Sequence, residues 1–390
     1  MKWSELYWHR ITPLHFILWP LSLLFSLLMA LRRFCYWLDL FPTTNLPIPV
    51  IVIDSITVED SGKTPLVIWL VNFLISRGLR PGIISQGFAD NPGEPVAATA
   101  ISDPAIVGSK SLLLVQRCGK DCPVWVGYDR IAVAHALLAA HPDCNILIND
   151  DGLQYHRLQR DMEVVVMDSS EQNFGNGLIL PAGPLRDSLK RLNKTNAVVM
   201  NNATKQQLNI KSQASIHNMR LLKDTFYNLM NPDSRVGPSA FSNKRLHAIS
   251  NLDNAQWFFD HLNFLRLSAE CHTFKKNHRF SKQDMQILGA EAILMTEEDA
   301  IQCHPFAKET LWALPVDVVI DVQLKEVILN KIREKFKVIT PLNTMVCPLC
   351  KKPIKYRKSE NDLICESDQL VFPIIDGIPV IQETSARKLS

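Results

Sequence analysis

The stretch PVIVIDSITVEDSGKTPLVIWLVNFLISRG, residues 49–78, decides the fold. Its first part, residues 49–56, is an uninterrupted apolar run of the kind that forms a parallel strand buried on both faces. Its last part, residues 62–78, has the length of a buried helix and ends at a glycine. This pattern predicts one strand-loop-helix unit of a parallel sheet that is covered by helices.

The same alternation continues along the chain. We expect further buried strands at residues 80–87, 124–127, 145–152, 162–168 and 196–202, with a helix that ends near Pro142. This indicates an α/β fold whose core, residues 41–204, is a P-loop-type parallel sheet. Strands at 245–252, 292–300 and 311–321, and helices at 257–265 and 322–336, predict a second, smaller α/β lobe over residues 205–338.

The N-terminal residues 1–40 are expected to associate with a membrane. Residues 15–31, HFILWPLSLLFSLLMAL, carry no formal charge apart from the histidine, although Pro20 interrupts them, and Arg32 and Arg33 follow. A spanning helix needs about 20 residues, so this segment is at the short end of that range. A buried core helix is the alternative. The paired arginines favour a catalytic body on the cytoplasmic side.

The bulk composition excludes two classes of protein. A net charge of +3 does not produce the positive field expected of a nucleic-acid-binding protein, so no nucleic acid partner is predicted. The nine cysteines are odd in number and scattered, which argues against a secreted disulfide scaffold. We interpret them as cytosolic thiols.

The loop between the first strand and its helix has features of a phosphate site. In such a loop, backbone N–H groups, a lysine and a hydroxyl surround phosphate oxygens. The nucleotide-binding residues would be Thr57, Val58, Glu59, Asp60, Ser61, Gly62, Lys63 and Thr64. The consensus is not met in full, because Thr57 replaces its first glycine. Glu59 and Asp60 also weaken phosphate binding, so a loop that no longer holds ATP is the alternative.

A pair of acids, Asp150 and Asp151, follows another expected buried strand. Ligands of α/β sheets bind at the carboxyl ends of strands. One acid of such a pair can hold Mg²⁺ and the other can orient or deprotonate an attacking hydroxyl. A simple strand-end turn with a capping acid is the alternative interpretation.

With these segments in view, the chain resembles the lipid A 4′-kinase (tetraacyldisaccharide 4′-kinase) family over about residues 1–335. The matching segments are SGKTP at 61–65, SQG at 85–87, VGYDR at 126–130, DDGLQYHRLQRD at 150–161, FGNGLILPAGPLRD at 174–187 and, more loosely, NH at 277–278 and TEEDA at 296–300. The resemblance implies transfer of the γ-phosphate of ATP, with Mg²⁺, to the 4′-hydroxyl of an acylated glucosamine disaccharide lipid. It also implies work at the cytoplasmic face of the bacterial inner membrane.

The resemblance assigns roles to individual residues. Lys63 would neutralise phosphate charge, Thr64 and Asp150 would hold magnesium, and Asp150 and Asp151 would lie at the reacting phosphate. His278 would lie near the acceptor hydroxyl, and Arg186 and Asp187 would face the sugar. Turn geometry alone is an alternative explanation for the FGNG and PAGP segments, and a surface position is the alternative for His278.

The chain departs from the family pattern in three segments. Glycines are usual at 59 and 60, the tetrapeptide G-D-E-P is usual where residues 108–111 read GSKS, and a lysine is usual at Glu298. The missing aspartate, replaced by Ser109, is thought to pair with the histidine as a base, and loss of a general base costs about 10²- to 10⁴-fold in rate. Either another acid such as Asp151 takes this role, or the chain is a degenerate relative that binds nucleotide or lipid without turnover.

The C-terminal residues 339–390 predict a separate β-rich module. It resembles small zinc-ribbon-like bacterial proteins related to tRNA-methyltransferase activator subunits, through CPLC, LIC and FPIIDGIPVI. Cys347, Cys350 and Cys365 could hold Zn²⁺. Asp368 stands where a fourth cysteine would be expected, and carboxylate is a poor substitute there, so a metal-free ribbon packed on Phe372, Ile374 and Ile378 is the favoured form. A third functional hypothesis is an interaction protein whose ribbon recruits a protein partner.

Overall fold

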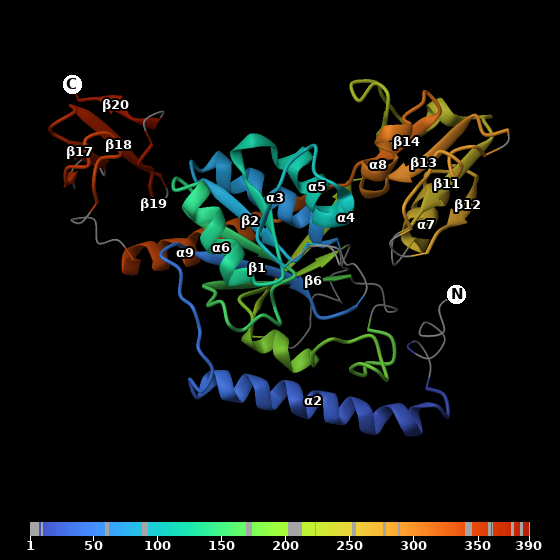
Figure 1. The fold of residues 1–390 in the computed structure, drawn as a ribbon, viewed down its shortest axis with the longest axis horizontal. Helices are drawn as coiled ribbons and strands as arrows, with labels where there is room; N and C mark the ends of the chain where they lie inside the picture. Colours follow the sequence, from blue (N-terminus) through green and yellow to red (C-terminus); the bar gives the residue numbers. More distant parts are fainter. Residues whose placement is uncertain are drawn as a thin grey trace.

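The computed structural model describes residues 8, 11–58, 62–87, 93–168, 174–201, 213–222, 224–251, 255–275, 278–287, 289–339, 345–357, 360, 362–375, 378–382 and 385–389. Three β-sheets organise this part of the chain. In Figure 1 the core sheet and its helices occupy the centre, the second lobe and the ribbon lie at opposite ends, and helix α2 runs beneath the core.

The core sheet contains nine of the described strands, in the order β15-β8-β7-β6-β1-β5-β2-β4-β3. Their bounds are β1 Val50–Ser55, β2 Pro81–Ser85, β3 Val96–Ala98, β4 Val124–Val126, β5 Ile146–Asp150, β6 Met162–Asp168, β7 Ala197–Asn201, β8 Ser215–Leu222 and β15 Asp317–Ile320. The sheet is parallel except at its two edges, where β3 and β15 run antiparallel to their neighbours. The predicted helix-covered parallel sheet is therefore confirmed.

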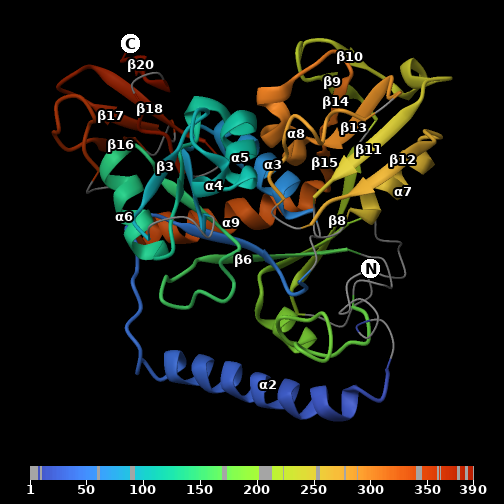
Figure 2. The ribbon, with the colours of Figure 1, turned by 45° about the vertical axis from the view of Figure 1, so that its right-hand side comes forward.

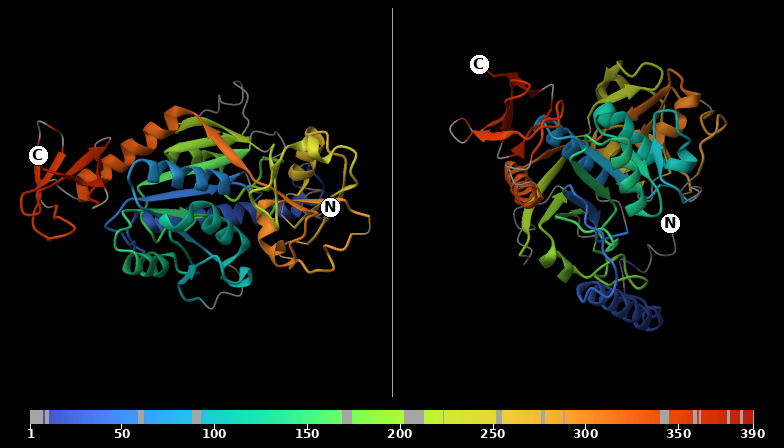
Figure 3. Two further views of the ribbon diagram at one scale, coloured as in Figure 1. Left: turned by 90° about the horizontal axis from the view of Figure 1, so that it is seen from above. Right: turned by 60° about the vertical axis from the view of Figure 1, so that its left-hand side comes forward.

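Helices cover both faces of this sheet (Figure 3). Helices α3 (Lys63–Ser76), α5 (Ser109–Cys118) and α9 (Val322–Ile339) pack on one face and share a single apolar cluster with β1 and β2. Helix α6 (Arg130–Ala140) covers part of the other face. All six residues of β1 are buried because the sheet is covered on both sides, and the apolar residues Val50–Ile53 are followed by the buried polar side chains of Asp54 and Ser55.

The second lobe is smaller than predicted. Its sheet has the order β10-β9-β14-β13-β11-β12. The strands are β9 Phe226–Asn228, β10 Arg235–Val236, β11 Leu246–Ser250, β12 Ala269–Thr273, β13 Ala292–Thr296 and β14 Leu311–Leu314, and the helices are α7 Gln256–Phe264 and α8 Glu297–Cys303. The predicted boundaries at 205 and 338 are corrected, because β8, β15 and α9 belong to the core. The lobe is an insertion between two adjacent strands of the core sheet.

The N-terminal helix α2, His15–Trp37, is longer than the apolar run predicted and continues through Pro20. By length and composition it is the one helix of the described residues that could cross a membrane. Most of its large apolar side chains are exposed, such as Phe16 at 84% and Leu27 at 64%. It is therefore not the buried core helix that the sequence left open.

Helix α2 contacts the core through polar groups on one of its sides. Ser22 Oγ donates to the carbonyl of Ile179 at 2.7 Å, and Arg33 donates to Asp187 at 2.7 Å. The His15 ring lies 3.1 Å from the carbonyl of Ala182. Figures 1 and 2 show the helix running beside the segment that carries these partners. The FGNGLILPAGPLRD segment thus docks α2 along its length.

The C-terminal ribbon is an antiparallel sheet of β16 Lys355–Arg357, β17 Asp362–Cys365, β18 Leu370–Ile375, β19 Ile378–Pro379 and β20 Arg387–Lys388. Phe372 is fully buried within it. The ribbon contacts the core where Gln382 Nε2 donates to the carbonyl of Gly78 at 2.8 Å. The predicted β-rich C-terminal module is confirmed.

The second lobe contains a buried acid, Asp299, with a pH-dependent contribution to stability. Burial raises its pKa to about 6, although hydrogen bonds from Thr296 and Asn251 favour its ionised form. An aspartate of the unfolded chain has a pKa of about 3.9, so the folded state binds the proton more tightly. The stabilisation that comes from the proton bound to Asp299 is complete below about pH 4 and is lost as the pH rises through about 6.

The Asp299→Asn variant should therefore lose less stability than the wild-type protein when the pH is raised. Between pH 4.5 and 7.5 the wild-type lobe should lose about 2 kcal/mol more unfolding free energy than the variant. Urea unfolding of both proteins at both pH values, followed by hydrogen exchange of the β11 amides, measures this difference. An equal loss in the two proteins would show that the buried carboxyl is not what titrates.

Candidate functional site

The loop between β1 and α3 is described in part. Gly62 caps α3 with φ +86°, a left-handed conformation that favours glycine, and an added Cβ would lie 3.2 Å from the Met219 side chain. Lys63 and Thr64 then begin the helix and are both buried. The predicted residues Glu59, Asp60 and Ser61 lie outside the described part of the chain.

The first half of the loop is held by the segment 174–187. The Val58 N–H donates to the carbonyl of Pro184 at 3.0 Å, and Thr57 bridges to Leu185. The Thr57 carbonyl accepts a hydrogen bond from Ser55 Oγ at 2.8 Å. The same segment that docks α2 therefore also shapes the predicted nucleotide loop.

Three carboxylates converge next to Lys63. Strands β1 and β5 are parallel neighbours with Ile53 opposite Asp150, so their carboxyl ends lie side by side at the same end of the sheet. Lys63 Nζ forms an ion pair with Asp151 and lies 3.8 Å from Asp54 Oδ1. Asp150 is fully buried, whereas 31% of the Asp151 side chain is exposed. The structure thus brings together the predicted Lys63, Asp150 and Asp151 and adds Asp54.

Sequence reasoning missed Lys110, the second cation of this cluster. Lys110 Nζ lies 2.7 Å from Asp150 Oδ2 and 3.1 Å from Asp151 Oδ2. It is the second residue of α5, which begins after Gly108, and it follows Ser109, where the family pattern has an aspartate. The signal that could have revealed it was present in the sequence, since a basic residue replaces the acid usual at position 110.

The charges shift the acids in opposite directions. Burial raises the pKa of Asp150, and the ammonium of Lys110 opposes that change. Burial also disfavours ionisation of Asp151, but Lys110 and Lys63 together hold its pKa well below the usual range. Burial, together with the nearby charge of Asp151, raises the pKa of Asp54. Asp151 is therefore the acid of the cluster whose ionised form is favoured most strongly.

Five buried side-chain polar atoms have no hydrogen-bond partner among the described residues, and two of them are Thr64 Oγ1 and Arg130 Nη1. Both belong to segments with site residues, and the charges of Asp150 and Asp151 act on Arg130. Buried polar atoms are nearly always paired, so unpaired ones point to a missing ligand. A hydroxyl and carboxylates are the oxygen donors that Mg²⁺ prefers, so Thr64 and Asp150 fit the predicted magnesium site.

The two predicted sugar-facing residues point in different directions. Arg186 Nη1 lies 3.8 Å from Asp54 Oδ1, and its Nη2 donates to the carbonyl of Val58 at 3.5 Å. Asp187 instead accepts the hydrogen bond of Arg33 and is buried. Arg186 thus belongs to the charged cluster, while Asp187 attaches α2.

His278 lies in the second lobe, away from the acid pair in its described contacts. Its Nε2 lies 3.1 Å from Asp284 Oδ2, and its ring stacks on Phe274. Ser109 lies at the boundary between the core and this lobe, because its hydroxyl accepts from Gln302 of α8 at 3.0 Å. The structure joins His278 to neither Asp150 nor Asp151.

The ribbon brings the predicted cysteines together. Ligand atoms of Cys347, Cys350, Cys365 and Asp368 all lie within 4.8 Å of one another. Cys347 and Asp368 are 3.0 Å apart, and the sulfurs of Cys350 and Cys365 are 3.5 Å apart. The donor set is compatible with one tetrahedral Zn²⁺. The carboxylate of Asp368, which stands in place of a fourth cysteine, lies in the same cluster.

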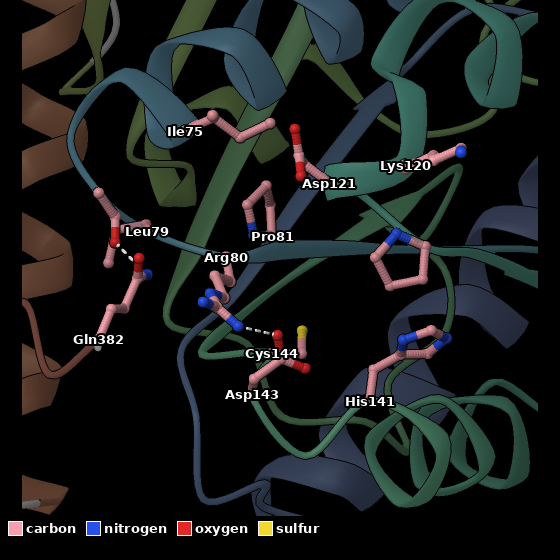
Figure 4. A pocket seen from close by; sticks show the side chains of 12 residues that line it. Ile75, Leu79, Arg80, Pro81, Lys120, Asp121, His141, Asp143, Cys144 and Gln382 are labelled. Atoms are coloured by element: carbon pink, nitrogen blue, oxygen red, sulfur yellow. Dashed lines mark hydrogen bonds and ion pairs between the residues drawn. The ribbon is translucent and has the colours of Figure 1, made fainter. Parts of the chain in front are cut away.

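A cavity of about 440 Å³ lies at the end of the core sheet where β2 and β5 begin (Figure 4). Its lining includes Pro81, the first residue of β2, Cys144, which precedes β5, and Gln382 of the ribbon. It therefore lies at the amino ends of β2 and β5, whereas the acid pair lies at the carboxyl end of β5. This cavity is separate from the charged cluster.

Comparison with known families supports the interpretation of both regions. Residues 14–333 match the model of the family described as tetraacyldisaccharide-1-P 4′-kinase (LpxK), and residues 341–377 match the Trm112p-like protein family. In fold, the chain is similar to LpxK from Aquifex aeolicus in complex with ATP, with 22% sequence identity and a TM-score of 0.67. That match covers 80% of this chain and 98% of the other.

Curated relatives extend the match to the whole chain. The chain is 47% identical over 389 residues to the tetraacyldisaccharide 4′-kinase of Nitrosomonas eutropha, covering 100% of this chain and 98% of the relative. The kinase of Methylobacillus flagellatus is 40% identical over 331 residues, covering 85% of this chain and 96% of that relative. The match therefore includes the charged cluster, and the chain belongs to the tetraacyldisaccharide-1-P 4′-kinase family.

Proposed function

We propose that this chain is a transferase of lipid A biosynthesis that moves the γ-phosphate of ATP to the 4′-hydroxyl of a tetraacyldisaccharide 1-phosphate. The observation that carries the proposal is the convergence of Lys63, Asp150 and Asp151 at the carboxyl ends of β1 and β5. Catalysis of phosphoryl transfer rests on positioning and charge stabilisation, and this cluster supplies both.

The phosphates of ATP would bind at the N-terminus of α3. Lys63 is already turned toward the cluster, and the N-terminal amides and dipole of α3 favour an anion there. The unpaired Arg130 Nη1 is a further donor near the same acids. Thr64 and Asp150 would hold Mg²⁺, which neutralises phosphate charge when it is bound.

Asp151 is the residue we assign to the acceptor hydroxyl. Ser109 cannot act as a base, and it already accepts a hydrogen bond from Gln302. The Asp151 carboxylate is partly exposed and charged, so it can accept a hydrogen bond from the attacking hydroxyl. Because a loose transition state requires little proton removal in advance, a weak base at this position is sufficient.

Lys110 would contribute to charge stabilisation in the same site. Its ammonium contacts both Asp150 and Asp151 and is 22% exposed, so it can reach an incoming phosphoryl group without leaving the cluster. A second fixed cation beside the transferred group stabilises the negative charge that develops there. Lys110 is therefore assigned a stabilising role beside Lys63.

Helix α2 would lie in the plane of the membrane surface. Its contacts at His15, Ser22 and Arg33 tie about 27 Å of its length to the core, because a helix rises about 1.5 Å per residue. The hydrocarbon layer is about 30 Å thick, so the helix cannot cross it and keep these contacts. The exposed apolar side chains would enter the lipid while the active site faces the cytoplasm.

The ribbon would act as an accessory of the kinase. It lies at the end of the molecule opposite the second lobe, far along the chain from the charged cluster (Figures 1 and 3). Its Cys347 cluster would hold Zn²⁺ as a structural ion, and its exposed edge is suited to a protein partner.

Lys63→Ala should abolish product formation. Loss of a fixed donor to the transferred phosphate costs about 10²- to 10³-fold in kcat. The assay measures 4′-phosphorylated product from the disaccharide 1-phosphate, ATP and Mg²⁺, with Lys120→Ala, an exposed lysine outside the cluster, as the control. ATP binding without turnover in the wild-type protein would identify a degenerate relative, and absence of both would leave an interaction protein.

Lys110→Gln should lower kcat by about 10- to 100-fold, because it removes one fixed cation from the site. Lys110→Arg keeps the charge and should retain most activity. Thermal unfolding of both variants separates a folding defect from a catalytic one, since Asp150 loses a partner in the glutamine variant. Faster turnover in Lys110→Gln would mean that Lys110 obstructs the acid pair.

The two tryptophans at the ends of α2 test the membrane orientation. Trp19 and Trp37 are exposed and about 27 Å apart along the helix axis. In the plane of the membrane they should reach equal depths, which quenching by lipids brominated at different acyl positions measures. The fluorescence lost in Trp19→Phe and in Trp37→Phe gives the signal of each residue separately from that of the other tryptophans. A spanning helix would also place its two ends at equal depths, so Leu27→Trp, an exposed position between them, supplies the contrast: a depth near the bilayer centre there would support a spanning helix.

A further inference from the structure

The second lobe contains a cluster of two histidines and a glutamate that the kinase chemistry does not use. His247 lies on β11, and Glu270 and His272 lie on the adjacent edge strand β12. The strands are parallel with His247 opposite Glu270, and residues 270 and 272 point to the same face because side chains alternate along a strand. The pairing therefore places all three side chains on one side of the sheet.

The distances within the cluster are those of metal ligands. His247 Nδ1 lies 3.0 Å from His272 Nε2 and 3.7 Å from Glu270 Oε2. His272 Nε2 lies 3.9 Å from Glu270 Oε1. Ligand atoms about 2.0–2.1 Å from a tetrahedral Zn²⁺ are about 3.3 Å apart, which falls within this range. One ion could thus contact all three groups after shifts of a few tenths of an ångström.

The environment of the cluster also suits an ion. The His247 side chain is 10% exposed, the His272 side chain 31% and the Glu270 side chain 70%, so the cluster is buried on one side and open to water on the other. The two ring nitrogens lie 3.0 Å apart, close enough for one ring to donate an N–H hydrogen bond to the other. A metal ion would use the same two nitrogens in place of that hydrogen bond.

We propose that His247, Glu270 and His272 form a binding site for one divalent transition-metal ion. Imidazole nitrogens with one carboxylate oxygen suit Zn²⁺, Ni²⁺, Co²⁺ or Cu²⁺ and do not suit Mg²⁺ or Ca²⁺. Three protein ligands leave a fourth position for water. The ion would join β12, an edge strand with one partner in the described sheet, to β11 and thereby stabilise the edge.

Cobalt distinguishes this site from the cysteine cluster of the ribbon, because thiolate ligands add strong near-ultraviolet charge-transfer absorption and His and Glu ligands do not. Full-length protein freed of metal by chelation is titrated with Co²⁺ and, by calorimetry, with Zn²⁺. Wild-type protein should bind one more ion than Glu270→Gln or His272→Gln at low metal concentration. Each substitution should weaken that event by at least about 10- to 100-fold, as changes around metal sites do.

Two controls make the outcome decisive. His135→Gln, an exposed histidine of α6, should leave the binding unchanged. Glu270 is mostly exposed, so its substitution does not threaten the fold, and hydrogen exchange of the β12 amides should slow on metal addition only when Glu270 is present. Equal stoichiometry and affinity in wild type and Glu270→Gln, or cobalt absorption arising from thiolates alone, would overturn the proposal.

Discussion

The site depends on the balance of charge where β1 and β5 end. Asp54 and Asp150 are buried almost completely, and taking a carboxylate out of water costs several kcal/mol unless a cation accompanies it. Lys63 and Lys110 supply those cations, and Arg186 lies within 4 Å of Asp54. The acids hold the ammonium groups of Lys63 and Lys110 in position for a bound triphosphate. The same lysines are the partners of the carboxylates that a magnesium ion would contact.

The segment 174–187 connects this cluster to helix α2. Consecutive residues perform the two tasks, because Arg186 points to Asp54 and Asp187 binds Arg33 of α2. In the same segment, the Pro184 carbonyl accepts the hydrogen bond of the Val58 N–H. A lipid head group that enters beside α2 would therefore meet the nucleotide loop within a few residues of the contacts that hold this helix.

The second lobe is attached to the core at α5 by polar contacts and by Ile301 of α8, which belongs to the apolar cluster of the core. Its chain leaves after β8 and returns at β15, which pair with each other as antiparallel strands of the core sheet. Between the two bodies, Arg117 binds Glu297 at 2.7 Å and Gln302 donates to Ser109 at 3.0 Å. The interface between the two bodies therefore combines charged, polar and apolar contacts.

The sequence by itself determined the strand-loop-helix unit at residues 49–78, the acid pair at the end of β5, the apolar α2 and the family. The first three features are local, since periodicity and spacing within a short stretch specify them. The family follows from the resemblance of short motifs along the chain. Only the tertiary structure decided that Lys110 lies over Asp150 and Asp151, that β15 and α9 return to the core, and that His247 meets Glu270 and His272. Those outcomes follow from the order and register in which strands distant in sequence pair, and no local pattern contains that information.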